Sequence, residues 1–105
     1  MQHITPEVLK QRLDRGDKLE LIDVRDPWEF ETCLITGSRN IPMVELETRL
    51  QTINPLEEIV VICHHGTRSL QVAGYLESLG YQNMICLEGG VHLWAQTVDP
   101  EMPQY

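Results

Sequence analysis

The amino-acid sequence predicts an α/β fold, with a central, mostly parallel sheet of about five short strands and helices on both faces. Short apolar segments alternate with amphipathic ones along the chain, which is the pattern of parallel strands joined by helices. The length of 105 residues suits one small domain with its own core. The most apolar segment, residues 59–62, is expected at the centre of the sheet, where a strand is buried on both faces.

The first predicted helix begins after Thr5 and ends at Gly16. Thr5 can cap the helix, Pro6 is tolerated at its first position, and glycine commonly follows a helix end. Residues 19–24 are predicted to form a strand, because the segment is short, mostly apolar and rich in branched side chains.

A second, short helix is predicted to begin at Asp26, with proline next and Glu29 placed for a capping box. We expect Trp28 and Phe30 to be packing residues rather than ligand contacts. Residues 35–42 are predicted to form a loop with one very short strand.

The second half of the chain repeats the alternation. Helical spacing follows Pro42 and ends at Asn54-Pro55. After the apolar strand, residues 69–79 are predicted to form an amphipathic helix, in which Gly74 is expected to allow close packing on the sheet.

A buried strand over residues 83–87 and a short helix over residues 91–95 complete the predicted fold. We therefore expect a single domain over residues 1–98. Residues 99–105 are polar and broken by proline, so we expect a loosely ordered C-terminal tail.

Composition narrows the possible functions. The net charge of −8 argues against nucleic acid, and any bound anion must be held by local geometry against a repulsive global field. No apolar run is long enough to span a membrane, and the N-terminal residues lack the pattern of a signal peptide. Three widely separated cysteines do not suggest a disulfide framework, so a reducing, cytoplasmic location is expected.

The segment with the clearest chemical character is the junction between residues 58 and 70. An apolar strand ends at Cys63, and a short polar loop with a glycine and Arg68 leads into a helix. Main-chain N–H groups of such a loop and of a helix start attract negative charge, and they favour the thiolate, which is the nucleophilic form of cysteine. The alternative, an inert core cysteine, does not account for the polar, cationic loop.

Asp23 and Arg25 end the strand before the second helix. The carboxyl ends of parallel strands are where α/β folds bind ligands, so this pair is either a structural ion pair, part of the site, or both. A zinc site is not expected, because adjacent side chains such as His64 and His65 rarely converge on one ion and no Cys-x-x-Cys spacing occurs. His3 and His92 are expected to be ordinary surface or packing residues.

Four segments, in order along nearly the whole chain, resemble the signature segments of single-domain rhodaneses, the thiosulfate sulfurtransferase-like family. They are Leu21-Ile22-Asp23-Val24-Arg25 with Trp28-Glu29-Phe30, then Ile35-Thr36-Gly37-Ser38-Arg39-Asn40-Ile41-Pro42, then Cys63-His64-His65-Gly66-Thr67-Arg68-Ser69, and finally Glu88-Gly89-Gly90 with Trp94. One departure is that Cys33 and Leu34 stand where the family usually has glycine and histidine. Cys33 is either a packed thiol or a second redox group near Cys63.

The resemblance implies a rhodanese-like fold and a sulfurtransferase without metal or organic cofactor. Cys63 would accept a sulfane sulfur from a small anionic donor such as thiosulfate, and pass it from a persulfide to cyanide, a thiol or a protein cysteine. The loop residues His64, His65, Gly66, Thr67 and Arg68 would bind the substrate. Arg25 would help to shape the pocket, and Asp23 would be structural.

Two alternatives to this enzyme follow from the same resemblance. One is a protein-to-protein sulfur carrier with little thiosulfate activity, and the other is a regulatory domain without catalysis, which the intact Cys63 disfavours. Phosphatases of related architecture have five residues between cysteine and arginine, whereas four lie between Cys63 and Arg68. The tighter loop suits one sulfur atom better than a phosphate. The chain is expected to act as a monomer or a weak dimer.

Overall fold

A five-stranded parallel sheet runs through the computed structural model, which describes residues 1–105. The elements follow one another as β1 (Gln2–Ile4), α1 (Pro6–Asp14), β2 (Glu20–Asp23), α2 (Pro27–Thr32), β3 (Arg39–Asn40), η1 (Met43–Glu45), α3 (Leu46–Arg49), η2 (Leu50–Thr52), β4 (Ile59–Ile62), α4 (Thr67–Ser78), β5 (Met84–Leu87) and α5 (Gly90–Thr97). The predicted α/β class is confirmed.

The strands lie in the order β1-β5-β4-β2-β3, which places β4 at the centre. Ile59 of β4 lies opposite Glu20 of β2 on one side and Met84 of β5 on the other. All four residues of β4 are buried, because helices cover both faces of the sheet at this point. The central position predicted for this strand is therefore confirmed.

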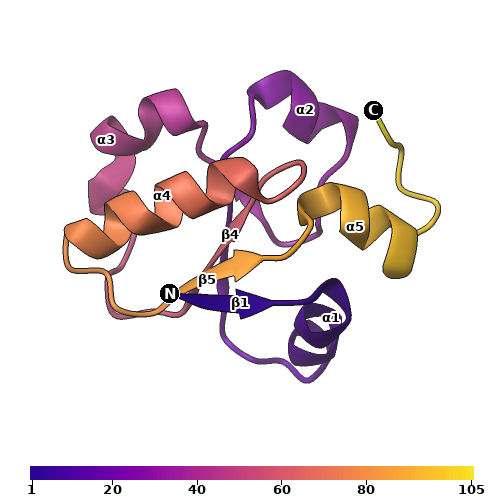
Figure 1. Cartoon of the computed structure of the whole chain (residues 1–105), viewed down its shortest axis with the longest axis horizontal. Coiled ribbons are helices and arrows are strands. Elements are labelled where there is room, and N and C mark those ends of the chain that lie inside the picture. The colour runs from indigo at the N-terminus through magenta and orange to yellow at the C-terminus, as the bar shows by residue number, and fades with distance from the viewer.

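Side chains that alternate along β4 enter two separate cores. Ile59, Val61 and Cys63 belong to a core that α3 and α4 cover, whereas Val60 and Ile62 belong to a core that α1 and α5 cover. Figure 1 shows α3 beside α4, and α1 beside α5. Cys63 is thus directed toward the layer that contains α4.

Both predicted helix starts form as expected. The hydroxyl of Thr5 accepts a hydrogen bond of 3.3 Å from the main-chain N–H of Val8. A capping box joins Asp26 and Glu29 at the start of α2. No helix is both long and apolar enough to cross a membrane.

Three features were not anticipated from the sequence. The short edge strand β1, which pairs with β5, was not predicted, because a three-residue segment with one buried side chain has no readable period. Trp28 packs edge-on against Tyr105, with ring centroids 5.4 Å apart, but it is 58% exposed and lies outside the core. Gly74 is exposed, and a Cβ there would meet no atom within 4 Å, so close packing on the sheet does not explain this glycine.

The C-terminal tail, residues 99–105, makes contacts with the body of the protein. Met102 is buried in the core beneath α1 and α5. The hydroxyl of Tyr105 donates a hydrogen bond of 2.8 Å to the carboxylate of Glu29. The C-terminal tail therefore contacts α2 through Glu29.

Candidate active site

Cys63 lies at the carboxyl end of the central strand, where the chain leaves the sheet. Residues 63–68, called the Cys63 loop below, connect β4 to the first turn of α4. The side chain of Cys63 is buried, with 1% of the residue exposed. Its position follows from the sheet, because the strand before it is fixed on both sides by hydrogen-bonded neighbours.

Two main-chain N–H groups point at the sulfur of Cys63. The N–H of Gly66 lies 2.9 Å from Sγ, and the N–H of Ser69, in the first turn of α4, lies 3.4 Å from it. Sulfur accepts such bonds best when it is negatively charged, and the positive end of the helix dipole adds to the effect. The loop therefore has the donors needed to stabilise negative charge at one sulfur atom.

Gly66 provides the backbone turn that aims these donors. Its φ of 104° lies in the left-handed region, which a residue with a Cβ rarely adopts, and it caps α4. The hydroxyl of Ser69 donates a hydrogen bond of 2.8 Å to the carbonyl of Gly66 and closes the turn. The predicted anion cradle thus has a defined main-chain geometry.

The first turn of α5 fixes the Cys63 loop through main-chain hydrogen bonds. The N–H of Val91 donates to the carbonyl of Cys63 at 2.9 Å, and the N–H of His92 donates to that of His64 at 3.0 Å. These bonds turn the two carbonyls away from the sulfur and toward α5. Gly90 makes this approach possible, because a Cβ at Gly90 would overlap both carbonyl oxygens.

A carboxylate of α2 holds the other end of the loop. Glu29, which is 4% exposed, accepts two hydrogen bonds from the Arg68 guanidinium at 2.7 and 2.8 Å. It also accepts hydrogen bonds from the N–H of Asp26 and from the Tyr105 hydroxyl. The bonds from Arg68 are the main cause that lowers the pKa of Glu29 to about 2. Arg68 is therefore held against α2 by this pairing.

Arg25 is fully buried, and its donors are used inside the protein. It pairs with Asp23 at 2.6 Å and reaches the carbonyl of Cys33 at 2.6 Å and the Tyr105 hydroxyl at 2.8 Å. Burial alone would lower the pKa of Arg25, but the hydrogen bonds to Asp23 and Tyr105 outweigh burial, and the pKa is raised. Arg25 positions the segment after β2, and Asp23 is its ion-pair partner. The role in shaping the pocket that the sequence suggests for Arg25 stays a prediction.

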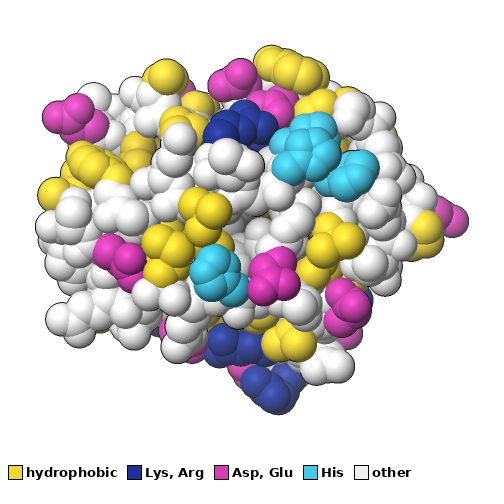
Figure 2. All heavy atoms as spheres, viewed as in Figure 1, with side chains coloured by type: hydrophobic (Ala, Val, Ile, Leu, Met, Phe, Trp, Pro, Cys, Tyr) yellow, Lys and Arg dark blue, Asp and Glu magenta, His cyan; other side chains and the backbone are white.

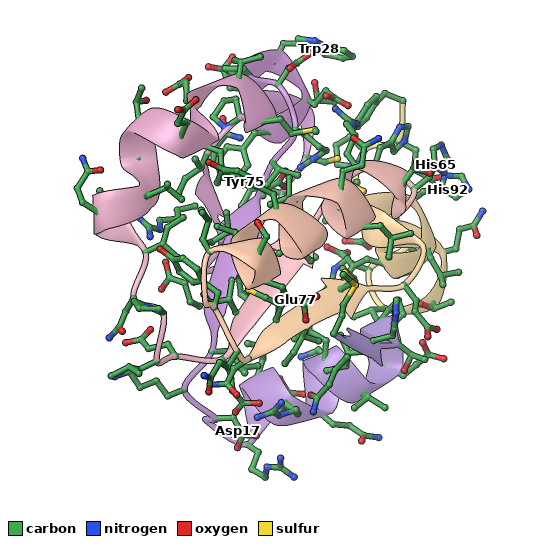
Figure 3. The ribbon with its side chains drawn as sticks, turned by 60° about the vertical axis from the view of Figure 1, so that its left-hand side comes forward. Asp17, Trp28, His65, Tyr75, Glu77 and His92 are labelled. Atoms are coloured by element: carbon green, nitrogen blue, oxygen red, sulfur yellow. The ribbon has the colours of Figure 1, made fainter.

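Aromatic side chains gather over the outer side of the loop. The His64 ring stacks on Tyr105, with centroids 4.1 Å apart and planes at 15°. His65 is exposed, and its ring centroid lies 4.0 Å from that of His64 and 4.7 Å from that of His92. Figure 3 shows His65 and His92 next to each other, and Figure 2 shows paired histidine side chains at the surface. Burial lowers the pKa of His64.

The two other cysteines lie on different faces of the sheet. Cys86 shares the core of Cys63, whereas Cys33 belongs to the core on the opposite face. Both are buried, and burial raises the pKa of Cys86. The placement of Cys33 agrees with a packed thiol rather than a partner of Cys63.

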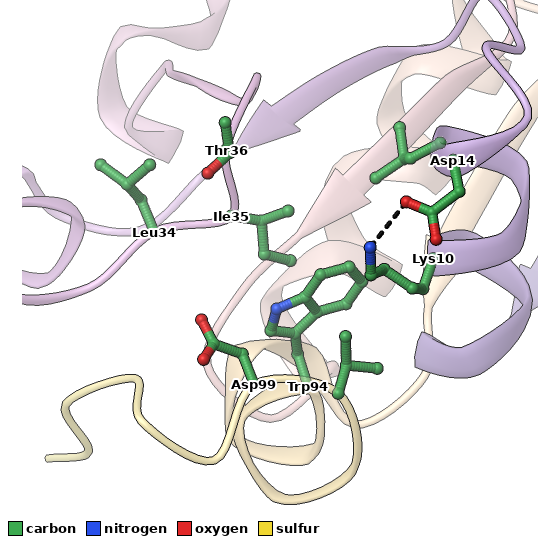
Figure 4. A pocket seen from close by; sticks show the side chains of 9 residues that line it. Lys10, Asp14, Leu34, Ile35, Thr36, Trp94 and Asp99 are labelled. Atoms are coloured by element: carbon green, nitrogen blue, oxygen red, sulfur yellow. Dashed lines mark hydrogen bonds and ion pairs between the residues drawn. The ribbon is translucent and has the colours of Figure 1, made fainter.

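The largest hollow of the surface is separate from the Cys63 loop. It has a volume of about 500 Å³ and is an open groove between α1, the segment 34–36 and α5. Figure 4 shows its lining, with the ion pair between Lys10 and Asp14 on one side, Leu34 and Thr36 on the other, and Trp94 next to Lys10. A second hollow of about 260 Å³ borders the loop and is lined in part by His65, Gly66 and Thr67.

The structure brings the predicted residues of the Cys63 loop together with three residues that were not assigned to the site. Glu29, His92 and Tyr105 all contact the loop or its side chains. Glu29 was noted in a capping box and in a signature segment but was given no role in the site, because its pairing with Arg68, 39 positions away, leaves no local pattern. Tyr105 lies in a polar, proline-broken segment that gave no structural signal.

Known proteins match the chain over most of its length. The model of the rhodanese-like domain matches residues 5–97. The thiosulfate sulfurtransferase GlpE of Pseudomonas aeruginosa is 32% identical over 93 residues, with 89% of this chain and 83% of that protein covered. The crystal structure of a rhodanese-like domain protein from Staphylococcus aureus superposes with a TM-score of 0.84 at 33% identity, with 90% of this chain and 91% of that one covered.

Several of the matched relatives are longer. The putative sulfur carrier protein YrkF of Bacillus subtilis is 35% identical over 91 residues, which cover 87% of this chain and 49% of that protein. The chain spans between 26% and 49% of the length of the first curated relatives it matches. The family model and the structural match nevertheless cover nearly all of the present chain. The chain therefore belongs to the rhodanese-like domain family.

Proposed function

We propose that this protein is a sulfurtransferase in which Cys63 carries the transferred sulfur as a persulfide. The observation that carries the proposal is the pair of main-chain N–H groups, of Gly66 and Ser69, directed at the Cys63 sulfur. They stabilise a thiolate before the reaction and can stabilise the terminal sulfur of a persulfide after it. The sulfurtransferase name of a relative with similar length agrees with this chemistry.

The loading step with thiosulfate needs no redox partner. The Cys63 thiolate attacks the outer sulfur of thiosulfate, a new S–S bond forms, and the old S–S bond breaks. Sulfite leaves with the electron pair of the broken bond, and Cys63 becomes a persulfide anion. In the second step a thiophilic acceptor, such as cyanide or a thiolate, attacks the outer sulfur and the Cys63 thiolate is regenerated.

The geometry of the loop favours sulfur over phosphate as the transferred group. The two donors converge on one atom, and the loop has four residues between Cys63 and Arg68. Since Arg68 is paired with Glu29, the carboxylate already offsets its positive charge and less of that charge is left for a bound phosphate. Main-chain donors remain for the terminal sulfur, which carries a single negative charge.

The test is intact-protein mass spectrometry after exposure to thiosulfate, compared between the wild type and Cys63→Ser. We expect one added sulfur in the wild type and none in the variant, while circular dichroism shows that the fold persists. Cys33→Ser is the matched control and is expected to load normally, because Cys33 lies in the other core. Sulfur loading of Cys63→Ser would overturn the proposed mechanism.

A second candidate function, that of a protein-to-protein sulfur carrier, is supported by the pairing of the arginines. Arg25 and Arg68 are both engaged by carboxylates, and the net charge is −8, so a free dianion such as thiosulfate meets little attraction. A persulfide delivered by a protein donor does not depend on such attraction. Fast loading by a cysteine desulfurase with cysteine, together with slow loading by thiosulfate, would identify a carrier.

A further inference from the structure

Three of the four histidines of the chain meet at the surface beside the Cys63 loop. His64 and His65 come from the loop, and His92 comes from α5. Each ring offers one ligand nitrogen, and these nitrogens lie within 4.8 Å of one another. The sequence-based view of His92 as an ordinary surface or packing residue did not anticipate this cluster, because 27 positions separate it from His65.

We propose that His64, His65 and His92 form a binding site for a late first-row transition-metal dication, of which Zn²⁺ is the probe of choice. Imidazole nitrogen suits zinc, copper and nickel, whereas calcium and magnesium prefer oxygen ligands. Three protein ligands leave a fourth position for water. Because His65 is exposed and the other two are partly exposed, an ion can reach the site from solvent.

The rings are held by neighbours, which lowers the entropic cost of binding. Tyr105 stacks on His64 with a centroid distance of 4.1 Å. The side-chain amide nitrogen of Gln96 lies 3.2 Å from Nε2 of His92. Because an amide nitrogen only donates, this amide must turn its oxygen toward His92 or release the ring when His92 binds an ion. The hydrogen bond of 3.0 Å from the His92 N–H to the His64 carbonyl fixes α5 and the loop relative to each other.

The three ligand nitrogens need to move only a short distance to bind one ion. Zinc–nitrogen distances of about 2.0–2.1 Å place tetrahedral ligand nitrogens about 3.4 Å apart. The nitrogens in the structure, at up to 4.8 Å, must therefore approach by about 1.4 Å at most. His65 can supply this movement by side-chain rotation, since it is exposed. The net charge of −8, which disfavours a free anion, favours a cation.

The test measures metal binding rather than sulfur transfer, so its outcome is independent of the proposed enzyme activity. It uses Cys63→Ser protein without a polyhistidine tag, which removes the reactive thiol as a ligand. Zn²⁺ is titrated by calorimetry, and Co²⁺ is followed by its visible absorption. We expect one ion per chain and the strong bands of tetrahedral or five-coordinate Co²⁺.

Single histidine substitutions then locate the ion. His92→Ala and His65→Ala are each expected to weaken Zn²⁺ binding at least tenfold, whereas His3→Ala, which removes the histidine outside the cluster, is expected to leave it unchanged. Thermal unfolding followed by circular dichroism confirms that each variant is folded. If His92→Ala does not fold, His65→Ala still tests the proposal. Equal Zn²⁺ affinity in folded His65→Ala and in the parent would overturn the proposal, as would the absence of Zn²⁺ binding by the parent.

Discussion

Two strand-to-helix junctions lie side by side in the sheet, one after β2 and one after β4, and they use their polar groups in opposite ways. After β2, the charged groups of Asp23, Arg25 and Glu29 are buried and paired within the protein. After β4, main-chain donors converge on the sulfur of Cys63, and the side chain of His65 is exposed to solvent.

The difference shows how a rigid junction can support a reactive one. Arg68 links them, because it comes from the second junction and binds the carboxylate of the first. No buried side-chain nitrogen or oxygen lacks a hydrogen-bond partner. Of the two junctions, it is the second that leaves groups available for chemistry, in the Cys63 loop.

The largest effect is expected from Gly90→Ala, which breaks the support behind the second junction. The new Cβ would overlap the carbonyl oxygens of Cys63 and His64, and alanine at a φ of 59° is itself strained. We expect the free energy of unfolding to fall by about 2–4 kcal/mol. We also expect sulfur loading to slow by roughly 100-fold, because a displacement of about 1 Å can cost that much. Urea unfolding and intact-mass time courses measure both.

Gly16→Ala is the matched control for this substitution. Gly16 also has a positive φ, of 85°, but a Cβ there would meet no atom within 4 Å. Only the backbone cost of about 1 kcal/mol is therefore expected, with normal sulfur loading. Equal effects of the two substitutions would show that close approach at Gly90 is unimportant.

The second largest effect on the free energy of unfolding is expected from Glu29→Gln, which removes the ion pair that links the two junctions. The substitution leaves the Arg68 guanidinium without its carboxylate partner. We expect a loss of about 2 kcal/mol in the free energy of unfolding, below the range for a fully buried pair because Arg68 is partly exposed. Glu31→Gln, on the exposed side of α2, is the control and should change stability by less than about 0.5 kcal/mol.

The same carboxylate predicts a pH dependence of stability. The folded pKa of Glu29 is about 2, below its ordinary value of 4.5, so the carboxylate contributes fully above pH 4.5. This contribution is lost as the pH falls toward 2, since both states then bind the proton. The difference in the free energy of unfolding between the wild type and Glu29→Gln should therefore shrink as the pH falls from 5 toward 2. The lower limit is about the pKa of Glu29 in the folded protein. A difference independent of pH would contradict the assigned ionisation.

A smaller effect on the free energy of unfolding is expected from Tyr105→Phe. This substitution tests how much the hydrogen bonds of Tyr105 stabilise the first junction. The substitution removes the hydroxyl that bonds Arg25 and Glu29 but keeps the ring on His64. A loss of about 1 kcal/mol is expected in thermal or urea unfolding. Tyr75→Phe, on α4, is the control, and a similar loss in both variants would show that the hydrogen bonds of Tyr105 contribute nothing.

The smallest effect is expected from Gly74→Ala, which lies outside both junctions. A Cβ at this exposed helical position meets no atom, so alanine should raise the free energy of unfolding by about 0.5–1 kcal/mol. Sulfur loading should not change. A loss of stability would mean that Gly74 has a packing role that its surroundings do not show.

Much of the fold follows from local patterns in the sequence. Alternating apolar segments, helix caps at Thr5 and Asp26, and the fully apolar strand before Cys63 are sufficient for the α/β class and the central strand. These features depend on neighbours a few residues apart, which is the range over which periodicity and capping operate. The short strand β1 and the exposure of Trp28 lie beyond that range.

The candidate site likewise has features that local sequence predicts and features that depend on tertiary contacts. The sequence by itself determined that Cys63 ends a buried strand and that a tight, glycine-containing loop follows it, because strand, loop and helix start are contiguous. Only the tertiary structure decided that Arg68 binds Glu29, that Arg25 is fully buried, and that His92 joins the loop histidines. These contacts join side chains from different elements, and their partners are set by the packing of the sheet and helices rather than by spacing along the chain.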